Sequence, residues 1–506
     1  MAERDSQNKI LENLDNARTS RFHIKTIFVA GMGFFSDAYD LFVLSTAFPA
    51  ILSVFNITSQ SNFFGTQTVN ILGATLSSVS VEEGMIGSAA LFGAFVGAIV
   101  FGRIADLKGR KYAYGVEMTI LVVFAIVSAL SVNVTMLIIS RFILGIGIGG
   151  DYPVSSTIMS EYANVKNRGK LISSVFAMQG FGLMAGSLIG IMSIHFLSLD
   201  YAWRLMLGFG SVPAAAVIYL RRRIKETPRF KLQIEGDAEG AALSVKQATG
   251  VSIDAAGQMQ VKRVGFLEAA KRYRMLIIGT AGSWLLFDMA FYGTSINNTL
   301  ILQSIGYGVV AGNVHQTIFN LAVGNTLLAA LFEIPGYWIA VGLMDRVGRK
   351  KLQWIGFTVM AMAYLVLALS YTTIENSLFL FFAVYGISFL FGNLGPNTTT
   401  FVLPTELFPT QFRTTGHGIA ASMGKFGAGV FTFLEPVLQF MFKLQGVIAI
   451  LFAISMLGAI LTLLTITETK NRSLEAISSQ FSEEIEIRVP RRSVKEELAR
   501  DYPRKN

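Results

Sequence analysis

Ionisable side chains interrupt several long apolar runs of this sequence. The acids are Asp37, Asp40, Glu117, Asp151 and Asp288, and the bases are Arg141 and Lys425. A charged group inside a lipid bilayer is costly, so each of these residues is a candidate for ligand binding or proton transfer. Lys and Arg side chains hold oxyanions through charge-assisted hydrogen bonds. The pattern therefore indicates an anion site bordered by protonatable carboxyls.

The spacing of these residues places several of them on shared helix faces. Asp37 and Asp40 are three residues apart, and Trp284, Asp288 and Tyr292 follow one another at intervals of four. Residues at these intervals face the same side of a helix. The aromatic–acid–aromatic stripe predicts one wall of a polar binding site. The alternative is a core helix in which Asp288 bonds a neighbouring backbone group.

Lys425 is the predicted ligand of the anion, because it stands almost alone in a long apolar, glycine-rich run. Five ionised acids facing two bases would repel an anion, so we expect some carboxyls to be protonated when the anion binds. Proton and anion then favour each other's binding. We expect Asp288 to pair with Lys425 in the empty site and to take a proton when the anion claims the lysine.

Three of the ionisable residues have structural alternatives. Arg141 can tie its helix to backbone groups of neighbouring helices. Glu117 lies about six residues inside Lys111, roughly 9 Å at helical rise, so it is either part of a proton path or a gate contact. Asp40 is either a proton site or a helix-packing residue.

The elements that position these residues are apolar runs long enough to cross a bilayer, which takes roughly 20 residues each. The composition agrees, with 52% hydrophobic and only 15% charged residues. We predict an all-α membrane protein with twelve transmembrane helices, near residues 24–55, 85–106, 111–132, 134–161, 168–196, 201–222, 274–304, 315–343, 352–372, 376–406, 413–441 and 444–467.

The basic residues cluster in alternate connections. The net charge is +9, but Lys and Arg gather at the N-terminus, in turns 103–111, 166–170 and 346–351, in 221–274 and in the tail, whereas 56–84 contains none. The positive-inside rule then predicts cytoplasmic termini and argues against nucleic acid as a partner. Residues 1–22 lack the apolar core of a cleavable signal peptide, so we expect the first helix to be retained.

The sequence divides into two related halves. We expect a segment 1–23, a six-helix bundle 24–222, a linker 223–270 with a surface helix, a second bundle 271–467 and a tail 468–506. Between the halves, Asp106 and Arg110 match Asp345 and Arg349 at an offset of about 240 residues. The same repeat relates Glu161 and Arg168 to Glu406 and Arg413. Duplicated six-helix halves are typical of transporters with a central site.

These repeated rim residues are better interpreted as a charge latch than as ligands. They lie at helix ends on the predicted cytoplasmic side, where ion pairs can hold one state together and break as the halves rock. The alternative is a solvated charged face. No cysteine, metal-ligand cluster or nucleophile–base set is present in the sequence, so we expect neither an enzyme nor a cofactor or metal.

Several stretches resemble a known family. GRIADLKGRK at 102–111 and RFILGIGIG at 141–149 resemble signature motifs of the major facilitator superfamily. Within that superfamily, GMGFFSDAYDLF at 31–42, GGDYP at 149–153 with MSE at 159–161, FAMQGFG at 176–182 and GPNTTT at 395–400 resemble the phosphate:proton symporter family. The resemblance covers nearly all of residues 24–467. The departures are a long 56–84 segment and a linker of modest length.

The resemblance implies proton-coupled symport of inorganic phosphate into the cell by alternating access. It implies a multi-pass protein of the plasma membrane that works as a monomer in the lipid bilayer. Protons would pass through Asp37, Glu117, Asp151 and Asp288. Phosphate would be held by Tyr152, Gln179, Trp284, Asp288, Tyr292, Asn397 and Lys425.

Two other functions are compatible with parts of the sequence. A proton symporter for a sugar or organic acid would share the rim signature and the segment 225–229, although sugar porters usually carry a Gln-Gln pair where this chain has Trp284 and Asp288. A transporter-like nutrient sensor would need a signalling module, and none is recognisable in the tail. The sequence leaves phosphate versus arsenate open.

Overall fold

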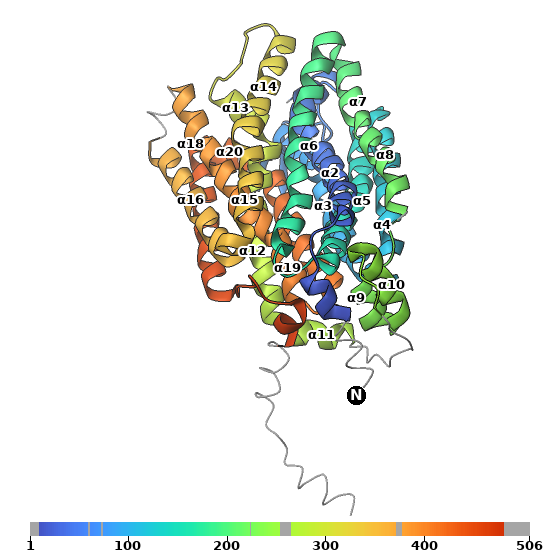
Figure 1. Cartoon of the computed structure of the whole chain (residues 1–506). Coiled ribbons are helices and arrows are strands. Elements are labelled where there is room, and N and C mark those ends of the chain that lie inside the picture. The colour runs from blue at the N-terminus through green and yellow to red at the C-terminus, as the bar shows by residue number, and fades with distance from the viewer. Residues whose placement is uncertain are drawn as a thin grey trace, which may run out of the picture.

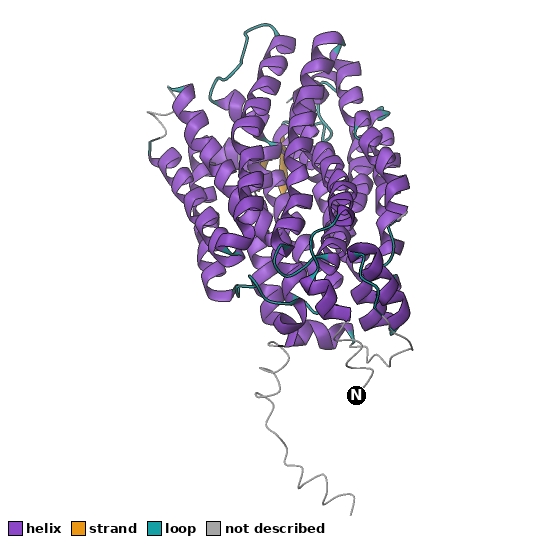
Figure 2. Ribbon diagram, viewed as in Figure 1, coloured by secondary structure: helices purple, strands orange, loops and turns teal. Residues whose placement is uncertain are grey.

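The apolar runs form helices because a helix satisfies every backbone N–H and C=O group within its own segment, as hydrocarbon requires. The structure, a computed structural model, describes residues 10–58, 61–71, 74–222, 224–253, 265–370 and 377–479. Its long helices run roughly side by side through the molecule (Figures 1 and 2). A small antiparallel hairpin, β1 (Thr68–Ile71) with β2 (Ala74–Ser77), lies between the first two long helices.

The first half of the chain supplies the helices that carry the acids predicted from the sequence. Its last span is broken, since α7 is followed directly by α8. The elements are α2 (Arg21–Val54), α3 (Ser78–Lys108), α4 (Arg110–Ala129), α5 (Val134–Tyr162), α6 (Arg168–Phe196), α7 (Leu199–Phe209) and α8 (Ser211–Arg222).

The second half is more irregular, because two of its spans contain π-helical turns. One such turn carries Asn397. The elements are α12 (Arg274–Ile296), α13 (Asn298–Ser304), α14 (Val314–Leu328), η2 (Ala329–Glu333), α15 (Ile334–Val347), α16 (Arg349–Leu369), α18 (Leu378–Gly392), η3 (Asn393–Asn397), α19 (Thr398–Leu407) and α20 (Arg413–Thr465).

Within the described residues, eleven helices are long and apolar enough to cross a membrane. The last of them, α20, has 53 residues and contains non-helical backbone at Lys443, with φ 57° and ψ 173°. An unbroken helix of that length would measure roughly 80 Å, against a hydrocarbon thickness of about 30 Å. The break falls between the last two predicted spans, 413–441 and 444–467.

The linker is more helical than expected. Where the sequence predicted a loop with one surface helix, the structure has α9 (Pro228–Phe230), a π-helical turn η1 (Lys231–Glu235), α10 (Ala238–Thr249) and α11 (Phe266–Arg272). These elements lie at one end of the bundle, together with the described start of the chain (Figure 1). Short helices at residues 10–16 and 474–479 join them there.

Glycines let α5 lie directly against α3. A Cβ atom on Gly145 would sit 2.0 Å from the carbonyl oxygen of Ala90, and one on Gly149 would sit 2.0 Å from that of Ala94. Small residues permit such backbone contact between membrane helices. This contact sets the position of α5 along its axis relative to α3. It therefore also sets the positions of Asp151 and Tyr152, which follow in the next turn.

Candidate functional site

A buried ion pair joins α20 to α12 in the middle of the bundle. The Lys425 Nζ atom lies 3.0 Å from Asp288 Oδ2. The same ammonium lies 4.5 Å from the ring centre of Tyr152 and 3.9 Å from that of Tyr292, at distances typical of cation–π contact. The contact predicted between Lys425 and Asp288 is therefore present, and its part in proton transfer stays a prediction.

A chain of hydrogen bonds extends from this pair across both halves. The Tyr152 and Tyr292 hydroxyls are 3.2 Å apart, and Gln179 Nε2 donates to the Tyr152 hydroxyl at 2.8 Å. Tyr337 donates to Gln179 Oε1 at 3.1 Å and accepts from Asn397 Nδ2 at 2.8 Å. Helices α5 and α6 are thereby linked to α12, α15 and η3. Tyr337 was missed in the sequence, because a single tyrosine in an apolar run has no distinguishing spacing.

The π-helical turn η3 explains how two asparagines reach the same network. Asn397 Nδ2 also donates to Asn393 Oδ1 at 2.7 Å. The wide turn contains Pro396, which cannot donate a backbone hydrogen bond. Local π-helical turns are frequent at functional sites.

Trp284 forms an aromatic wall of the site. Its ring centre lies 6.1 Å from that of Tyr152 and 5.3 Å from that of His417. Gly424 faces it so closely that a Cβ atom there would fall 2.4 Å from the indole. All seven predicted phosphate ligands are buried and converge on this region, so the site is enclosed in this structure.

Two of the predicted acids have a partner that sequence reasoning missed. Arg221, at the end of α8, places Nη2 2.6 Å from Asp151 Oδ2 and Nη1 3.0 Å from Asp151 Oδ1. Its Nη1 also lies 3.0 Å from Glu117 Oε1. The sequence places Arg221 in the basic stretch 221–274, outside the predicted set of five acids and two bases. The structure corrects that count, because the Arg221 guanidinium is buried and adds a third base.

The Asp37 carboxyl is buried in α2, and it interacts electrostatically with Lys425, Tyr152, Asp151 and Arg221. Both of its carboxylate oxygens are buried and have no hydrogen-bond partner among the described residues. A buried carboxyl without partners is costly unless protonated, so Asp37 has the environment of a proton carrier.

Arg141 and Asp40 form a separate contact. Arg141 Nη2 donates to the backbone carbonyl of Asp40 at 2.6 Å, which ties α5 to α2. The Asp40 carboxylate has no hydrogen-bond partner within the described chain, and it lies where a Cβ atom on Gly210 would come within 2.0 Å of Oδ1. The Arg141 hydrogen bond is the backbone contact that its structural alternative describes. For Asp40, the proton role and the packing role both stay predictions.

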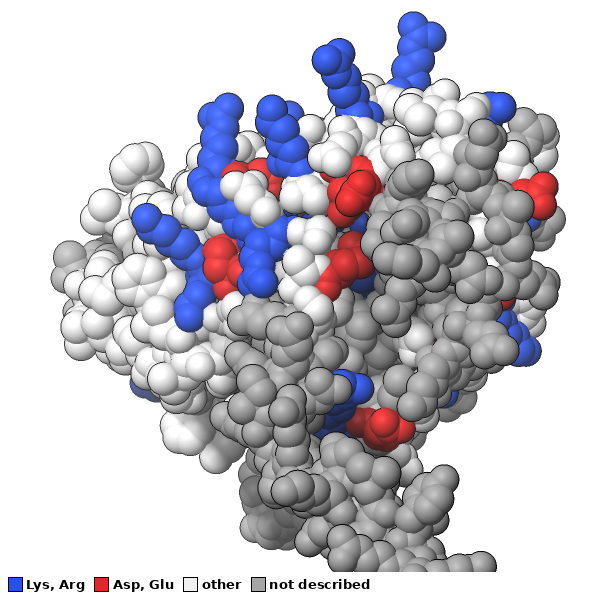
Figure 3. Space-filling model, turned by 60° about the horizontal axis from the view of Figure 1, so that its bottom comes forward, with Lys and Arg blue, Asp and Glu red and all other residues white. Residues whose placement is uncertain are grey.

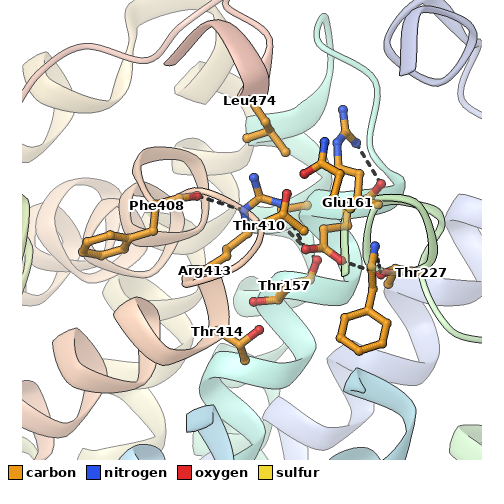
Figure 4. A network of polar contacts seen from close by, with 12 residues as sticks. Thr157, Glu161, Thr227, Phe408, Thr410, Arg413, Thr414 and Leu474 are labelled. Atoms are coloured by element: carbon orange, nitrogen blue, oxygen red, sulfur yellow. Dashed lines mark hydrogen bonds and ion pairs between the residues drawn. The ribbon is translucent and has the colours of Figure 1, made fainter. Parts of the chain in front are cut away.

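Ion pairs connect the two halves at the end of the bundle where the linker lies. Glu161 Oε1 is 3.0 Å from Arg110 Nη2 of its own half and 3.0 Å from Arg413 Nη1 of the other half. Its second oxygen accepts from the Thr227 hydroxyl, as Figure 4 shows. Asp106 accepts backbone N–H bonds from Thr414 and Thr415 at 3.3 and 2.7 Å.

The second half repeats this arrangement. Glu406 Oε1 lies 2.7 Å from Arg349 Nη2 and 2.9 Å from Arg168 Nε. The Thr469 hydroxyl donates to Glu406 as well. Asp345 accepts backbone N–H bonds from residues 169 and 170 at 3.1 and 2.7 Å. Seven of the eight rim residues therefore take part in contacts that cross between the halves, Arg110 also through the Thr410 carbonyl, whereas Arg349 pairs within its own half.

The linker and the tail extend the repeat further than the sequence showed. Glu226 accepts the backbone N–H of Lys111 at 3.1 Å, and Glu468 accepts that of Lys350 at 3.1 Å. Burial raises the pKa of Glu226. The pairs Glu226-Thr227 and Glu468-Thr469 are the signal that could have revealed this symmetry.

One arginine of the linker fastens three segments together. Arg229 lies 2.6 Å from Asp15 and 2.9 Å from Glu475, and it donates to the Glu161 carbonyl at 2.8 Å. Burial acts to raise the pKa of Glu475, but Arg229 outweighs it and lowers that pKa to about 2.

Comparison with known proteins places the chain in a family. The family described as "Sugar (and other) transporter" matches residues 26–481. The chain is 37% identical to inorganic phosphate transporter 1-11 of Oryza sativa subsp. japonica, over 93% of this chain and 90% of that one. It is 34% identical to low affinity inorganic phosphate transporter 4 of Petunia hybrida, over 95% and 96%.

Solved structures show the same fold. The major facilitator superfamily proton:xylose symporter XylE has a TM-score of 0.72 at 18% identity and covers 92% of this chain and 100% of its own. A partially occluded inward-open form of XylE from E. coli has a TM-score of 0.69 at 17% identity, over 88% and 100%. The chain is a transporter of the major facilitator superfamily and belongs, within its sugar (and other) transporter family, with the inorganic phosphate transporters.

Proposed function

We propose that this protein carries inorganic phosphate and protons together across a membrane, in the direction of the cell interior. The observation that carries the proposal is the buried Lys425–Asp288 pair, set over the Tyr152 and Tyr292 rings where the two halves meet. A lysine that an aspartate neutralises can bind an anion only when that aspartate is displaced or protonated. The relatives named as inorganic phosphate transporters support phosphate as the anion.

The residues around the pair fit a tetrahedral oxyanion. Lys425 offers a charged donor, and the side chains of Gln179, Asn397 and Tyr337 offer neutral ones from both halves. As phosphate approaches, Asp288 takes a proton and releases Lys425 to it. Phosphate then accepts hydrogen bonds from the donors that bond one another in the Tyr152–Gln179–Tyr337–Asn397 chain of this structure.

The energetics favour symport over simple anion entry. Moving one negative charge into a cell at 100 mV, inside negative, costs about 2.3 kcal/mol. One accompanying proton cancels this cost, and each unit of pH gradient adds about 1.4 kcal/mol of driving force. The protonatable acids beside the site, Asp37 and Asp288, provide the coupling.

Alternating access would operate by breaking one set of contacts between the halves at a time. The rim latch of Glu161, Glu406 and their arginines closes the end near the linker. Toward the other end, Thr299 of α13 donates to the backbone carbonyl of Ser45 in α2 at 2.7 Å. Both sets are made in this structure, which corresponds to an enclosed state from which either side can open.

The topology follows from charge and helix length. Figure 3 shows Lys and Arg side chains gathered on the face where the linker lies, which the positive-inside rule assigns to the cytoplasm. We further propose that the two parts of α20 on either side of Lys443 each cross the bilayer. This gives twelve spans, places both termini in the cytoplasm and suits a plasma-membrane transporter that works as a monomer.

The test is uptake of radiolabelled phosphate into proteoliposomes with an imposed inward proton gradient. Phosphate uptake by the wild type should exceed the equilibrium level, and a protonophore should abolish this excess. Lys425→Ala should abolish uptake, whereas Lys111→Ala, at an exposed lysine, should not. A wild type that ignores phosphate but accumulates a sugar or organic acid would keep the fold and overturn the substrate.

A further inference from the structure

Arg221 is placed unusually for an arginine at a helix end. Such side chains normally extend toward the water at the membrane surface. Here the guanidinium is turned into the bundle and is fully buried, between Asp151 of α5 and Glu117 of α4. Its Cζ atom lies over the Tyr114 ring, 4.2 Å from the ring centre. A buried charge with this many dedicated contacts is a functional candidate.

The three carboxyls near Arg221 are bound to it unequally. Asp151 receives two hydrogen bonds in the bidentate geometry that favours an ionised carboxylate, and Ser155 donates a third at 2.5 Å. Glu117 receives one hydrogen bond from Arg221, and its other oxygen has none within the described residues. Asp37 receives no hydrogen bond from any described residue.

The backbone of α2 makes this arrangement possible. Gly33 lies one helical turn before Asp37, and a Cβ atom on Gly33 would fall 1.6 Å from Arg221 Nη2 and 2.2 Å from Asp151 Oδ2. The glycine therefore lets the ion pair press against α2 on the face that carries Asp37. Asp37 follows one turn later on that face and makes no hydrogen bond or ion pair with Arg221 within the described residues.

We propose that Arg221 is a positioning residue for proton release: its buried charge stabilises the carboxylate of Asp37 once the transported proton has left. This proposal rests on the proposed symport. The proton leaves the Asp37 carboxyl, and the electron pair stays on the carboxylate. Arg221, already paired with Asp151, remains charged throughout.

The ionisable groups that act on Asp37 come from α2, α4, α5, α8 and α20. Loss of Arg221 removes a stabilising positive charge, whereas loss of Asp151 removes a repelling negative one, so the two changes act in opposite directions. The ionisable neighbours of Asp37 are Asp40, Glu117, Asp151, Tyr152, Arg221 and Lys425.

The test separates proton release from phosphate binding. Purified variants in proteoliposomes are assayed for phosphate accumulation under an imposed gradient of one pH unit, and for phosphate exchange at equal pH on both sides. Exchange needs a loaded carrier but no net proton release. One coupled proton can support about tenfold accumulation of phosphate for each unit of pH gradient. Arg221→Gln should lose this accumulation, while phosphate exchange persists.

The pH profile of exchange supplies the readout that a purely structural role would not move. The upper midpoint is the alkaline pH at which the rate of exchange falls to half of its maximum. Arg221→Gln should shift this midpoint to more alkaline pH by about one unit, because Asp37 holds its proton more tightly. Asp151→Asn should shift it toward acid pH. The double variant should lie near wild type, as expected for opposing effects on one group, and Arg221→Lys, which keeps the charge, should recover accumulation in part.

Arg204→Gln is the matched control, since Arg204 pairs with Asp200 in α7, outside this cluster. Its profile should equal that of wild type. Two outcomes would overturn the proposal. One is a pH profile of exchange that does not shift in Arg221→Gln. The other is an equal loss of exchange and accumulation in Arg221→Gln that the double variant does not recover. If wild type itself fails to accumulate phosphate on the gradient, the proposed symport fails, and the role of Arg221 with it.

Discussion

Glu161 of α5 and Glu406 of α19 occupy equivalent positions in the two halves. Each carboxylate pairs with one arginine of its own half and one of the other half. Each also accepts a hydroxyl hydrogen bond from the segment that follows its half, Thr227 for Glu161 and Thr469 for Glu406. The latch is therefore symmetric, and it joins the bundles to the linker and the tail.

Breaking one side of this latch should open the linker end of the molecule. Glu161→Gln leaves Arg413 without its buried counter-charge and Arg110 with Asp106 alone, which is strongly destabilising for the contact between the halves. Because the chain contains no cysteine, a single Ser160→Cys substitution reports access to the rim. Thiol labelling should be about tenfold faster with Glu161→Gln, as a shift of about 1.4 kcal/mol predicts.

The control for this experiment is Asp200→Asn, which removes a half-exposed ion pair at a distant position. Exposed pairs contribute little, so labelling should not change. Equal labelling in Glu161→Gln and wild type would show that the latch does not hold this end closed.

Asp288→Asn should still bind and exchange phosphate, because the neutral amide leaves Lys425 free as a protonated Asp288 would, but it should not accumulate phosphate on a pH gradient. The amide cannot take a proton, and Lys425 loses the partner that neutralises it between transport cycles. Gradient-driven uptake in proteoliposomes checks this expectation. Accumulation at the wild-type level would remove Asp288 from the coupling mechanism.

Tyr337→Phe tests a residue that only the structure identified. The change removes the donor to Gln179 and the acceptor for Asn397, leaving two buried amides less satisfied. At about 1 kcal/mol per lost hydrogen bond, KM for phosphate should rise roughly fivefold or more. Tyr112→Phe, at an exposed tyrosine, is the control. An unchanged KM would place Tyr337 outside the binding site.

Gly149→Ala should lower the melting temperature of the detergent-purified protein. The added Cβ meets the backbone of Ala94, which cannot move aside as a flexible side chain could. Gly115→Ala has open space around its Cβ and should be neutral or stabilising, since alanine favours helices by about 1 kcal/mol over glycine. Equal melting temperatures for both variants would contradict the close contact of α3 and α5.

The contact between Glu475 and Arg229 should resist mild acid. Because the pKa of Glu475 is lowered to about 2, its contribution is complete above the ordinary value of about 4.5 and fades only as pH falls toward 2. Hydrogen exchange of residues 474–479, expressed as a protection factor so that the intrinsic pH dependence of amide exchange is removed, should therefore be equally slow at pH 7 and pH 5. In Glu475→Gln it should be faster at both values, and a marked loss of protection between pH 7 and 5 in wild type would contradict the ion pair.

The fold was largely predictable because lipid imposes simple rules. Apolar run length gave the spans, and the repeat gave the two related halves. The twelve predicted spans correspond to eleven candidate helices within the described residues, because α20 continues through Lys443, which has a positive φ, and the count of twelve stays a prediction. The Trp284–Asp288–Tyr292 stripe was predictable from helical spacing, which is a local property of the chain.

The sequence by itself determined which residues could do chemistry, since a charge inside an apolar run is costly and has few roles. Only the tertiary structure decided how these charges pair. Arg221 looks like any basic residue at the end of a span, yet it reaches Asp151, which lies 70 positions away in the chain. Tyr337 likewise joins the site only through Gln179, 158 positions away. The physical reason is that pairing depends on which helices pack together and on where glycines let them approach, and neither is written in local spacing.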